Sequence, residues 1–218
     1  MELRDVIYEG PSIDNRDLLT QLPDEYRDLL QQINGFIQFY GGLHIRGLCT
    51  QPRWHSLSEV WFGDHALSAL YSDVRPDDIP FGQDVVGDQF VLRDTVVYHL
   101  SAETGEMASL DCTLDEFLQR AQEDPVGYLS LQPMLQFFHQ GGTLEPGQLI
   151  NVYPPFCSKE SANGVSLQAI STLERIRFLA NLARQIATLP DGSQVAFKGE
   201  QQNNNDNSGA KVQYSRRK

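Results

Sequence analysis

The stretch that most constrains the fold is residues 79–92, which read IPFGQDVVGDQFVL. Two glycines stand there among β-branched and aromatic residues that favour strands. Glycine inside a strand pattern marks a bulge, a tight bend or a close backbone approach, because it adopts dihedral angles that other residues avoid. We expect Asp84 and Asp88 to hydrogen-bond nearby backbone amides and, with Gly87, to form a structural turn. The stretch predicts a sheet-building element and indicates no particular chemistry.

Helix and strand patterns alternate on both sides of this stretch. Before it, apolar residues at i, i+3, i+4 and i+7 predict a helix over 23–34. After it, turn signals separate short strands as far as residue 111, which predicts an antiparallel meander. Thr113 and Glu116 have the spacing of a capping box and predict that a helix starts there. Other elements that we expect in the first half are a helical turn at 14–20, strands at 36–40 and 43–48, and an interrupted helix at 54–71.

Residues 126–198 are predicted to be an extension that packs on the first part of the chain. Ser171 and Glu174 again have capping-box spacing and predict a helix to about residue 188. Its apolar positions cover most of the circumference, so we expect it to be largely buried. Residues 199–218 offer too little apolar surface to offset the entropy of ordering, which predicts a disordered polar tail. Shorter elements expected in the extension are a helix at 131–139 and strands at 149–153 and 195–197.

Taken together, these elements predict an α+β fold. We expect a mainly antiparallel sheet of about five or six strands, the usual size of a sheet. The helices at 22–34 and 114–122 should pack on one face of it, and a helical extension should follow at the C-terminus.

Four of these elements carry a resemblance to a known family. They are the helix LPDEYRDLLQQING, the motif IPFG-D-x-x-GD-Q-F-x-L, the strand pair after it and the helix that contains DEFL. Over roughly residues 22–122 this arrangement resembles the SMI1/KNR4 (SUKH) superfamily. The resemblance implies a SUKH-like core at 1–125 and an α+β binding module, most often a bacterial immunity protein that neutralises a cognate toxin. The long segment after Pro125 departs from the family pattern.

The acidic charge of the chain is concentrated in its first part. The formal net charge is −12. Residues 1–130 contain 23 acidic residues against 8 Arg, a balance of −15, whereas residues 131–218 contain 6 acidic against 9 basic residues, a balance of +3. Such an acidic part repels nucleic acid and attracts cationic partners, so we expect no direct nucleic-acid binding. Without a visible signal segment or an apolar run that could cross a bilayer, the sequence favours a cytoplasmic protein with no membrane contact.

The residues that could support catalysis or metal binding follow no recognised pattern. The three cysteines and five histidines lack CxxC, HExxH and helical i, i+4 spacing. We therefore predict no catalytic residue, no metal and no cofactor. Two alternatives stay open at this point: Cys157, which follows two prolines, could serve a hydrolase, and His55 with His65 could bracket Asp64 at a metal site.

A run of acidic residues beside aromatic side chains is the candidate binding surface. Carboxylates around an aromatic anchor are typical of a hot spot inside a charged rim, although a merely solvated face gives the same pattern. The residues of this candidate surface are Glu59, Trp61, Asp64, Asp73, Asp77 and Asp78.

The function that we predict from the sequence is a non-enzymatic acidic binding module. Given the resemblance, its partner would be a cognate protein toxin or another basic protein domain. Two other readings remain: a regulatory scaffold of the SMI1/KNR4 type and, with less support, a hydrolase that depends on a cysteine or histidine.

Overall fold

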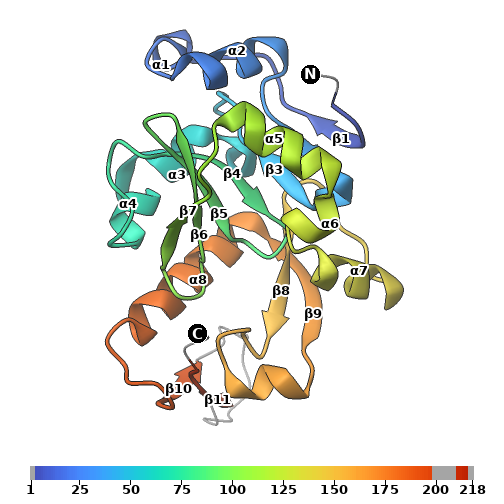
Figure 1. Ribbon diagram of the computed structural model, residues 1–218, viewed down its shortest axis with the longest axis vertical. Helices are drawn as coiled ribbons and strands as arrows, with labels where there is room; N and C mark the ends of the chain where they lie inside the picture. The colour runs from blue at the N-terminus through green and yellow to red at the C-terminus, as the bar shows by residue number, and fades with distance from the viewer. Residues whose placement is uncertain (1–2, 198–209, 216–218) are drawn as a thin grey trace.

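A seven-stranded antiparallel sheet forms the centre of the computed structural model, which describes residues 3–197 and 210–215 (Figure 1). The strands lie side by side in chain order, since each pairs with the strand that follows it. The sheet is larger than expected because the 79–92 stretch folds into two strands, and because β1 adds to the edge beside β2. The strands are β1 (Val6–Glu9), β2 (Phe36–Gln38), β3 (Leu43–Ile45), β4 (Ile79–Asp84), β5 (Gln89–Arg93), β6 (Val96–Leu100) and β7 (Met107–Ser109).

The helices begin largely where the cap signals place them. Thr113 Oγ1 accepts a hydrogen bond from the Glu116 amide at 3.4 Å, and the Glu116 carboxylate accepts one from the Thr113 amide at 2.9 Å, which confirms the first capping box. The second predicted box is wrong, because Ser171 precedes its helix but its side chain caps nothing. The helices are α1 (Arg16–Leu19), α2 (Asp24–Gln32), α3 (Leu57–Trp61), α4 (Leu67–Leu70), α5 (Leu114–Glu123), α6 (Pro125–Tyr128), α7 (Gln132–His139) and α8 (Thr172–Ile186).

The main core lies between the sheet and the α2–α5 pair, as expected. Phe81 on β4 is fully buried and meets the rings of Tyr26 on α2 and Phe117 on α5, with centroids 6.1 Å and 5.6 Å apart. Such edge-to-face aromatic contacts stabilise by about 0.5–1.5 kcal/mol each beyond the burial of their area. The apolar faces of both helices therefore pack into the same core layer against the sheet.

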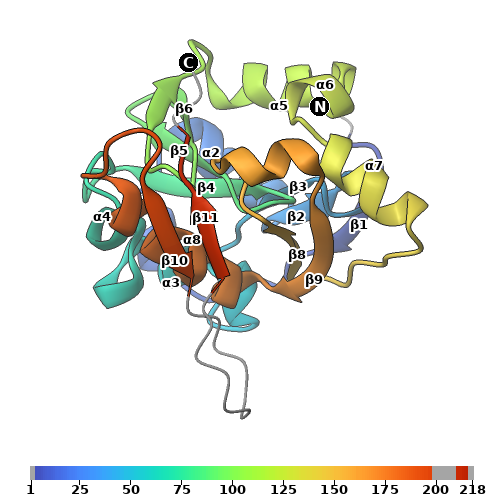
Figure 2. The same cartoon turned by 90° about the horizontal axis from the view of Figure 1, so that it is seen from below.

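A second buried cluster joins α3, α4 and α8 and adds a helical layer that the sequence does not predict. Val60 and Tyr71 from the 57–74 segment pack there with Leu100 at the end of β6 and Leu179 on α8. Figure 2 shows α5 on one side of the sheet and α3 with α8 on the other. The helices therefore do not all lie on one face.

The C-terminal extension attaches through its own ladder, β8 (Gln148–Tyr153) with β9 (Ser166–Ser171), and through α8. The backbone amide of Ile150 donates to the carbonyl of Val85 at 2.8 Å. Gly87 lies against α8, because a Cβ added there would stand 2.7 Å from Cδ1 of Leu179. Contacts from two parts of the extension thus converge on the turn between β4 and β5.

The predicted disordered tail is wrong for residues 210–215. There β11 (Ala210–Gln213) pairs with β10 (Gln194–Phe197), and Val212 and Tyr214 are buried beside Cys157. The composition of the tail is polar on average, but two apolar side chains two positions apart share one face of a strand. The rest of that prediction, residues 199–209 and 216–218, lies outside the described residues.

Candidate functional site

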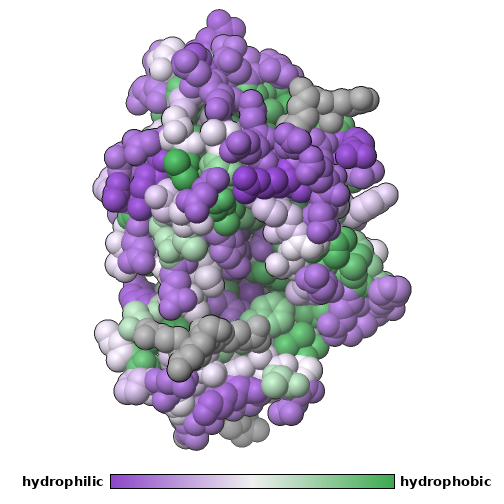
Figure 3. All heavy atoms as spheres, in the orientation of Figure 1, coloured by the Kyte–Doolittle hydropathy of each residue, from purple (hydrophilic) through white to green (hydrophobic). Residues whose placement is uncertain are grey.

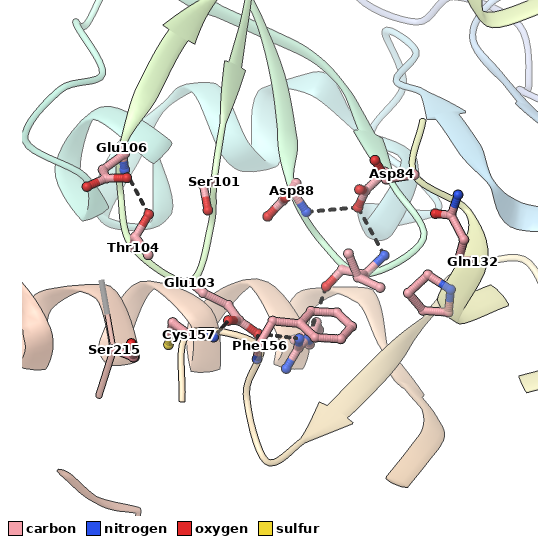
Figure 4. A pocket seen from close by; sticks show the side chains of 14 residues that line it. Asp84, Asp88, Ser101, Glu103, Thr104, Glu106, Gln132, Phe156, Cys157 and Ser215 are labelled. Atoms are coloured by element: carbon pink, nitrogen blue, oxygen red, sulfur yellow. Dashed lines mark hydrogen bonds and ion pairs between the residues drawn. The ribbon is translucent and has the colours of Figure 1, made fainter. Parts of the chain in front are cut away.

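A cavity of about 450 Å³ lies between the central sheet and the C-terminal extension. The sheet contributes the β4–β5 turn and the β6–β7 loop, and the extension contributes the start of α7, residues 156–157 and α8. Figure 3 shows the molecular surface hollowed between these two parts, and Figure 4 shows the side chains within. The charged residues in its lining are Asp84, Asp88, Glu103, Glu106 and Arg175.

Asp84 organises the turn on the sheet side of the cavity. Its Oδ1 accepts hydrogen bonds from the backbone amides of Val86, Gly87 and Asp88 at 3.0, 2.9 and 2.9 Å. Gly87 has a φ of +105°, a conformation that side chains with a Cβ rarely adopt. Asp84, Gly87 and Asp88 thus form one backbone turn whose carboxylates face the cavity (Figure 4).

The protonation of Asp84 depends on its burial and on the charge of Asp88. Burial, followed by the negative charge of Asp88, raises the pKa of Asp84 to about 7. Asp88 accepts a hydrogen bond from the Ala102 amide at 2.8 Å and lies 3.2 Å from Nε2 of His99. Burial lowers the pKa of His99, but the hydrogen bond and the charge of Asp88 outweigh it, so the pKa of His99 is raised overall.

Glu103 and Arg175 join the sheet to the extension across the floor of the cavity. The Glu103 carboxylate accepts hydrogen bonds from the backbone amides of Phe156 and Cys157 at 3.1 and 2.7 Å. Arg175, only 1% exposed, donates from Nε to the Val86 carbonyl at 3.0 Å, and its Nη2 lies 4.0 Å from Glu103. We call this arrangement the Glu103–Arg175 clamp.

Burial shifts the pKa of both members of the clamp toward the uncharged form. It raises the pKa of Glu103 and lowers the pKa of Arg175, while each charge partly offsets the shift of the other. Sequence reasoning missed both residues, since they stand 72 positions apart and neither belongs to a motif.

Cys157 lies at the edge of the cavity, but its surroundings are those of a packed thiol. It is 7% exposed and belongs to a cluster with Leu182, Ile186, Val212 and Tyr214. Free cysteines commonly fill such apolar sites. Across residues 3–197 and 210–215, no group of three or more His, Cys, Asp or Glu side chains is placed to hold a metal ion.

The predicted pairing of His55 with His65 at a metal site is wrong. His55 is fully buried, whereas His65 and Asp64 are exposed. His55 instead has its Nδ1 2.8 Å from Nε2 of His44, and its own Nε2 lies 2.9 Å from the Asn34 carbonyl. One tautomer satisfies both contacts: His44 Nε2–H donates to His55, and His55 Nε2–H donates to Asn34. Sequence spacing gave no sign of this buried pair.

The candidate binding surface is divided by the structure into exposed and structural residues. Asp64, Asp73 and Asp77 are exposed, and we call these three the acidic face. Asp78 is a correction to the predicted surface: it is 1% exposed and makes two hydrogen bonds to Arg93, at 2.8 and 2.7 Å. Its carboxylate holds β5 to the loop before β4 and is not accessible to a partner.

Glu59 and Trp61 are likewise partly engaged within the protein. The Glu59 side chain is 15% exposed and accepts a hydrogen bond from Nε of Arg53 at 3.0 Å. Trp61 is half-buried against the main core and stacks on Phe62, with ring centroids 4.6 Å apart. Phe62 is 48% exposed. The accessible aromatic ring beside the acidic face is therefore Phe62, one position from the residue that we predicted.

The fold defines an α+β protein built on an antiparallel sheet. Residues 15–120 match the model of the SMI1 / KNR4 family (SUKH-1), which confirms the resemblance. The match covers the chain from α1 to most of α5, just under half of its 218 residues. The cavity lies partly beyond it, since Phe156 and Arg175 come from the extension.

Two further comparisons were made over the whole chain. The crystal structure of Atu4351 from Agrobacterium tumefaciens is similar at 11% identity and a TM-score of 0.48, over 80% of this chain and 85% of that one. No curated protein matches the chain. No helix among the described residues has the length and apolar character needed to cross a membrane.

Proposed function

We propose that this protein is a non-enzymatic binding module, and that it acts in the cytoplasm as an immunity protein that binds and neutralises a cognate bacterial toxin. The match of residues 15–120 to the SMI1/KNR4 family supports a role in protein–protein interaction. The toxin would be a basic protein domain, because the part of the chain that matches the family carries most of the acidic residues.

The acidic face is the observation that carries this proposal. Asp64, Asp73 and Asp77 are exposed on the segments that flank α4, and Phe62, two positions before Asp64, is exposed as well. Arg75 is exposed in the same segment, so the face has a net formal charge of −3 + 1 = −2. An exposed aromatic ring next to uncompensated carboxylates provides both an anchor and long-range attraction.

Neutralisation would follow from occlusion of the toxin's active site. Carboxylates of the acidic face would occupy positions where the toxin holds an anionic substrate group, such as a phosphate. Electrostatic attraction would speed capture, which matters for a protein that must act before its target does damage.

Co-expression of the chain with the toxin domain encoded beside it tests the proposal. The chain should restore growth to cells that make the toxin domain, and the two purified proteins should form a stable complex. The triple variant Asp64→Asn, Asp73→Asn, Asp77→Asn should protect poorly. A matched control with the same change of charge, Asp17→Asn, Asp28→Asn, Asp115→Asn, should protect normally, because its residues lie on α1, α2 and α5.

Two results would contradict the proposal. Equal protection by both triple variants would remove the acidic face from the interaction. Failure of the unmodified protein to bind the adjacent gene product, together with capture of a partner encoded elsewhere, would favour the regulatory scaffold.

A further inference from the structure

The cavity between the sheet and the extension has the dimensions of a ligand site. Its volume of about 450 Å³ lies within the ~300–1,000 Å³ that is common for small-molecule sites. Phe156 and Pro133 give it an apolar wall, and Asp84 and Asp88 face them from the sheet (Figure 4). A site of this kind binds a group that has both a charge and an apolar stem.

The negative charge in this cavity is incompletely compensated. Glu103 is satisfied by two backbone amides and by Arg175, and Asp88 by the Ala102 amide and His99. Asp84 is 5% exposed, yet only its Oδ1 accepts hydrogen bonds from the described residues. Its Oδ2 accepts no hydrogen bond from the described residues, and Asp84 is part of the cavity lining.

The raised pKa of Asp84 is consistent with this missing partner. The charge of His99 lowers the pKa of Asp84 but does not outweigh burial and Asp88, and the guanidinium of Arg175 makes its hydrogen bonds to other groups. Its Nε donates to the Val86 carbonyl and its Nη1 to Asn151 at 2.7 Å. The cavity thus presents a buried acceptor that a cationic donor would satisfy.

We propose that this cavity binds an organic cation with N–H donors, a primary ammonium or a guanidinium group, between Asp84 and Asp88 and against the ring of Phe156. Anions are disfavoured because the carboxylates would repel them. A planar or tetrahedral nitrogen cation supplies several donors at once and gains further from an aromatic face. The site is separate from the acidic face, so the inference goes beyond the proposed function.

Two sources could supply such a cation: a lysine or arginine side chain of a protein partner, or a free small amine. N-acetyl-L-arginine amide carries the guanidinium alone, and 1,4-diaminobutane represents a free amine. N-acetyl-L-citrulline amide has nearly the same shape as the first probe but no charge. Binding is followed by NMR through the backbone amides of Val86 and Cys157, two residues that line the cavity.

We expect saturable shifts of both amides with at least one cationic probe and none with the citrulline compound. Asp88→Asn should weaken binding about tenfold, because one charge-assisted contact is lost. Gln132→Trp should abolish binding by filling the mouth of the cavity from α7, where Gln132 is exposed. The control Gln136→Trp, one helical turn further on and outside the cavity lining, should change nothing.

The same variants distinguish the sources. Loss of complex formation with the adjacent gene product in Gln132→Trp, but not in Gln136→Trp, assigns the cation to a partner side chain. Normal complex formation by Gln132→Trp, with loss of probe binding, assigns it to a free amine. The proposal is overturned if no cationic probe shifts these amides into the millimolar range, or if the shifts persist in Gln132→Trp. Neither result bears on the acidic face.

Discussion

The buried His44–His55 pair should make the protein lose stability as the pH falls from 6.5 toward 4. Burial lowers the pKa of His44 well below its usual value, and it lowers the pKa of His55 to about 4. His55 is therefore mostly neutral in the folded protein at pH 5, whereas in the unfolded chain both rings titrate with a pKa of ~6.5. Since the unfolded state binds more protons in this window, acid favours unfolding.

The size of the effect follows from the pKa shift of His55. At pH 5, the difference of about 1.5 pH units from an unfolded pKa of ~6.5 corresponds to roughly 2 kcal/mol, at about 1.4 kcal/mol per unit. Toward pH 4 the contribution of His55 approaches roughly 3 kcal/mol. The pair thus removes a substantial part of the ~5–15 kcal/mol by which a domain is usually stable.

Asp84 changes the free energy of unfolding in the opposite direction over the same pH range. Its contribution therefore has to be separated from that of the histidines. Its folded pKa lies above its unfolded value, so its contribution to stability is present at low pH and is lost as the pH rises toward 7. A comparison of two proteins that both contain Asp84 removes this effect. The variant is His44→Gln with His55→Gln, and its control is His65→Gln with His139→Gln, both of which change exposed rings.

Urea unfolding at pH 7 and pH 5 is the assay, with tryptophan fluorescence as the signal. Trp54 reports directly, because its ring centroid lies 5.4 Å from that of His44 and 5.5 Å from that of His55. The buried-pair variant should be less stable than the unmodified protein at pH 7, and that difference should shrink by at least about 2 kcal/mol at pH 5, since His44 adds to the effect of His55. The control should show no such change. A difference that is the same at both pH values would refute the neutral buried pair.

Two further predictions concern the contacts that join the extension to the sheet. Gly87→Val should lower the free energy of unfolding by a few kcal/mol, because it strains a positive φ and drives a side chain into Leu179. Gly141→Val is the matched control, with a φ of +84° but open space around it, and it should cost less; equal denaturant midpoints would contradict the contact. Arg175→Met should cost about 3–5 kcal/mol, because it leaves Glu103 buried without its cation, and Glu103→Gln in the same chain should recover part of this loss. An additive double-mutant cycle would show that the two clamp residues do not interact.

The sequence predicted the locally determined parts of the fold well. The helix α5 is confirmed from its capping box, and the β5–β7 meander follows from turn residues only a few positions apart. In these elements the cap or turn and its consequence lie within a few residues. The 79–92 stretch predicted a bend, but the bend is sharp enough to divide it into two strands around the Asp84 turn.

The cavity could not be predicted because distant segments build it. Glu103 and Arg175 look like ordinary surface charges in the sequence, and only the packing of α8 on the sheet buries them together. Asp78 shows the converse: in the sequence it is one more carboxylate of an acidic run, whereas in the fold Arg93 pairs with it. Charge patterns predict net attraction but do not tell which carboxylates a partner can reach.

The proposed function depends above all on electrostatic attraction between the acidic face and a basic partner. Stopped-flow binding to the adjacent gene product, at several salt concentrations, measures this. Exposed charges act over a Debye length of about 8–10 Å and mainly set the association rate. The association rate should therefore fall steeply as salt rises. The triple variant at Asp64, Asp73 and Asp77 should associate at least about tenfold more slowly at low salt, with a nearly unchanged dissociation rate. An association rate that is flat with salt and the same in the triple variant would contradict the claim.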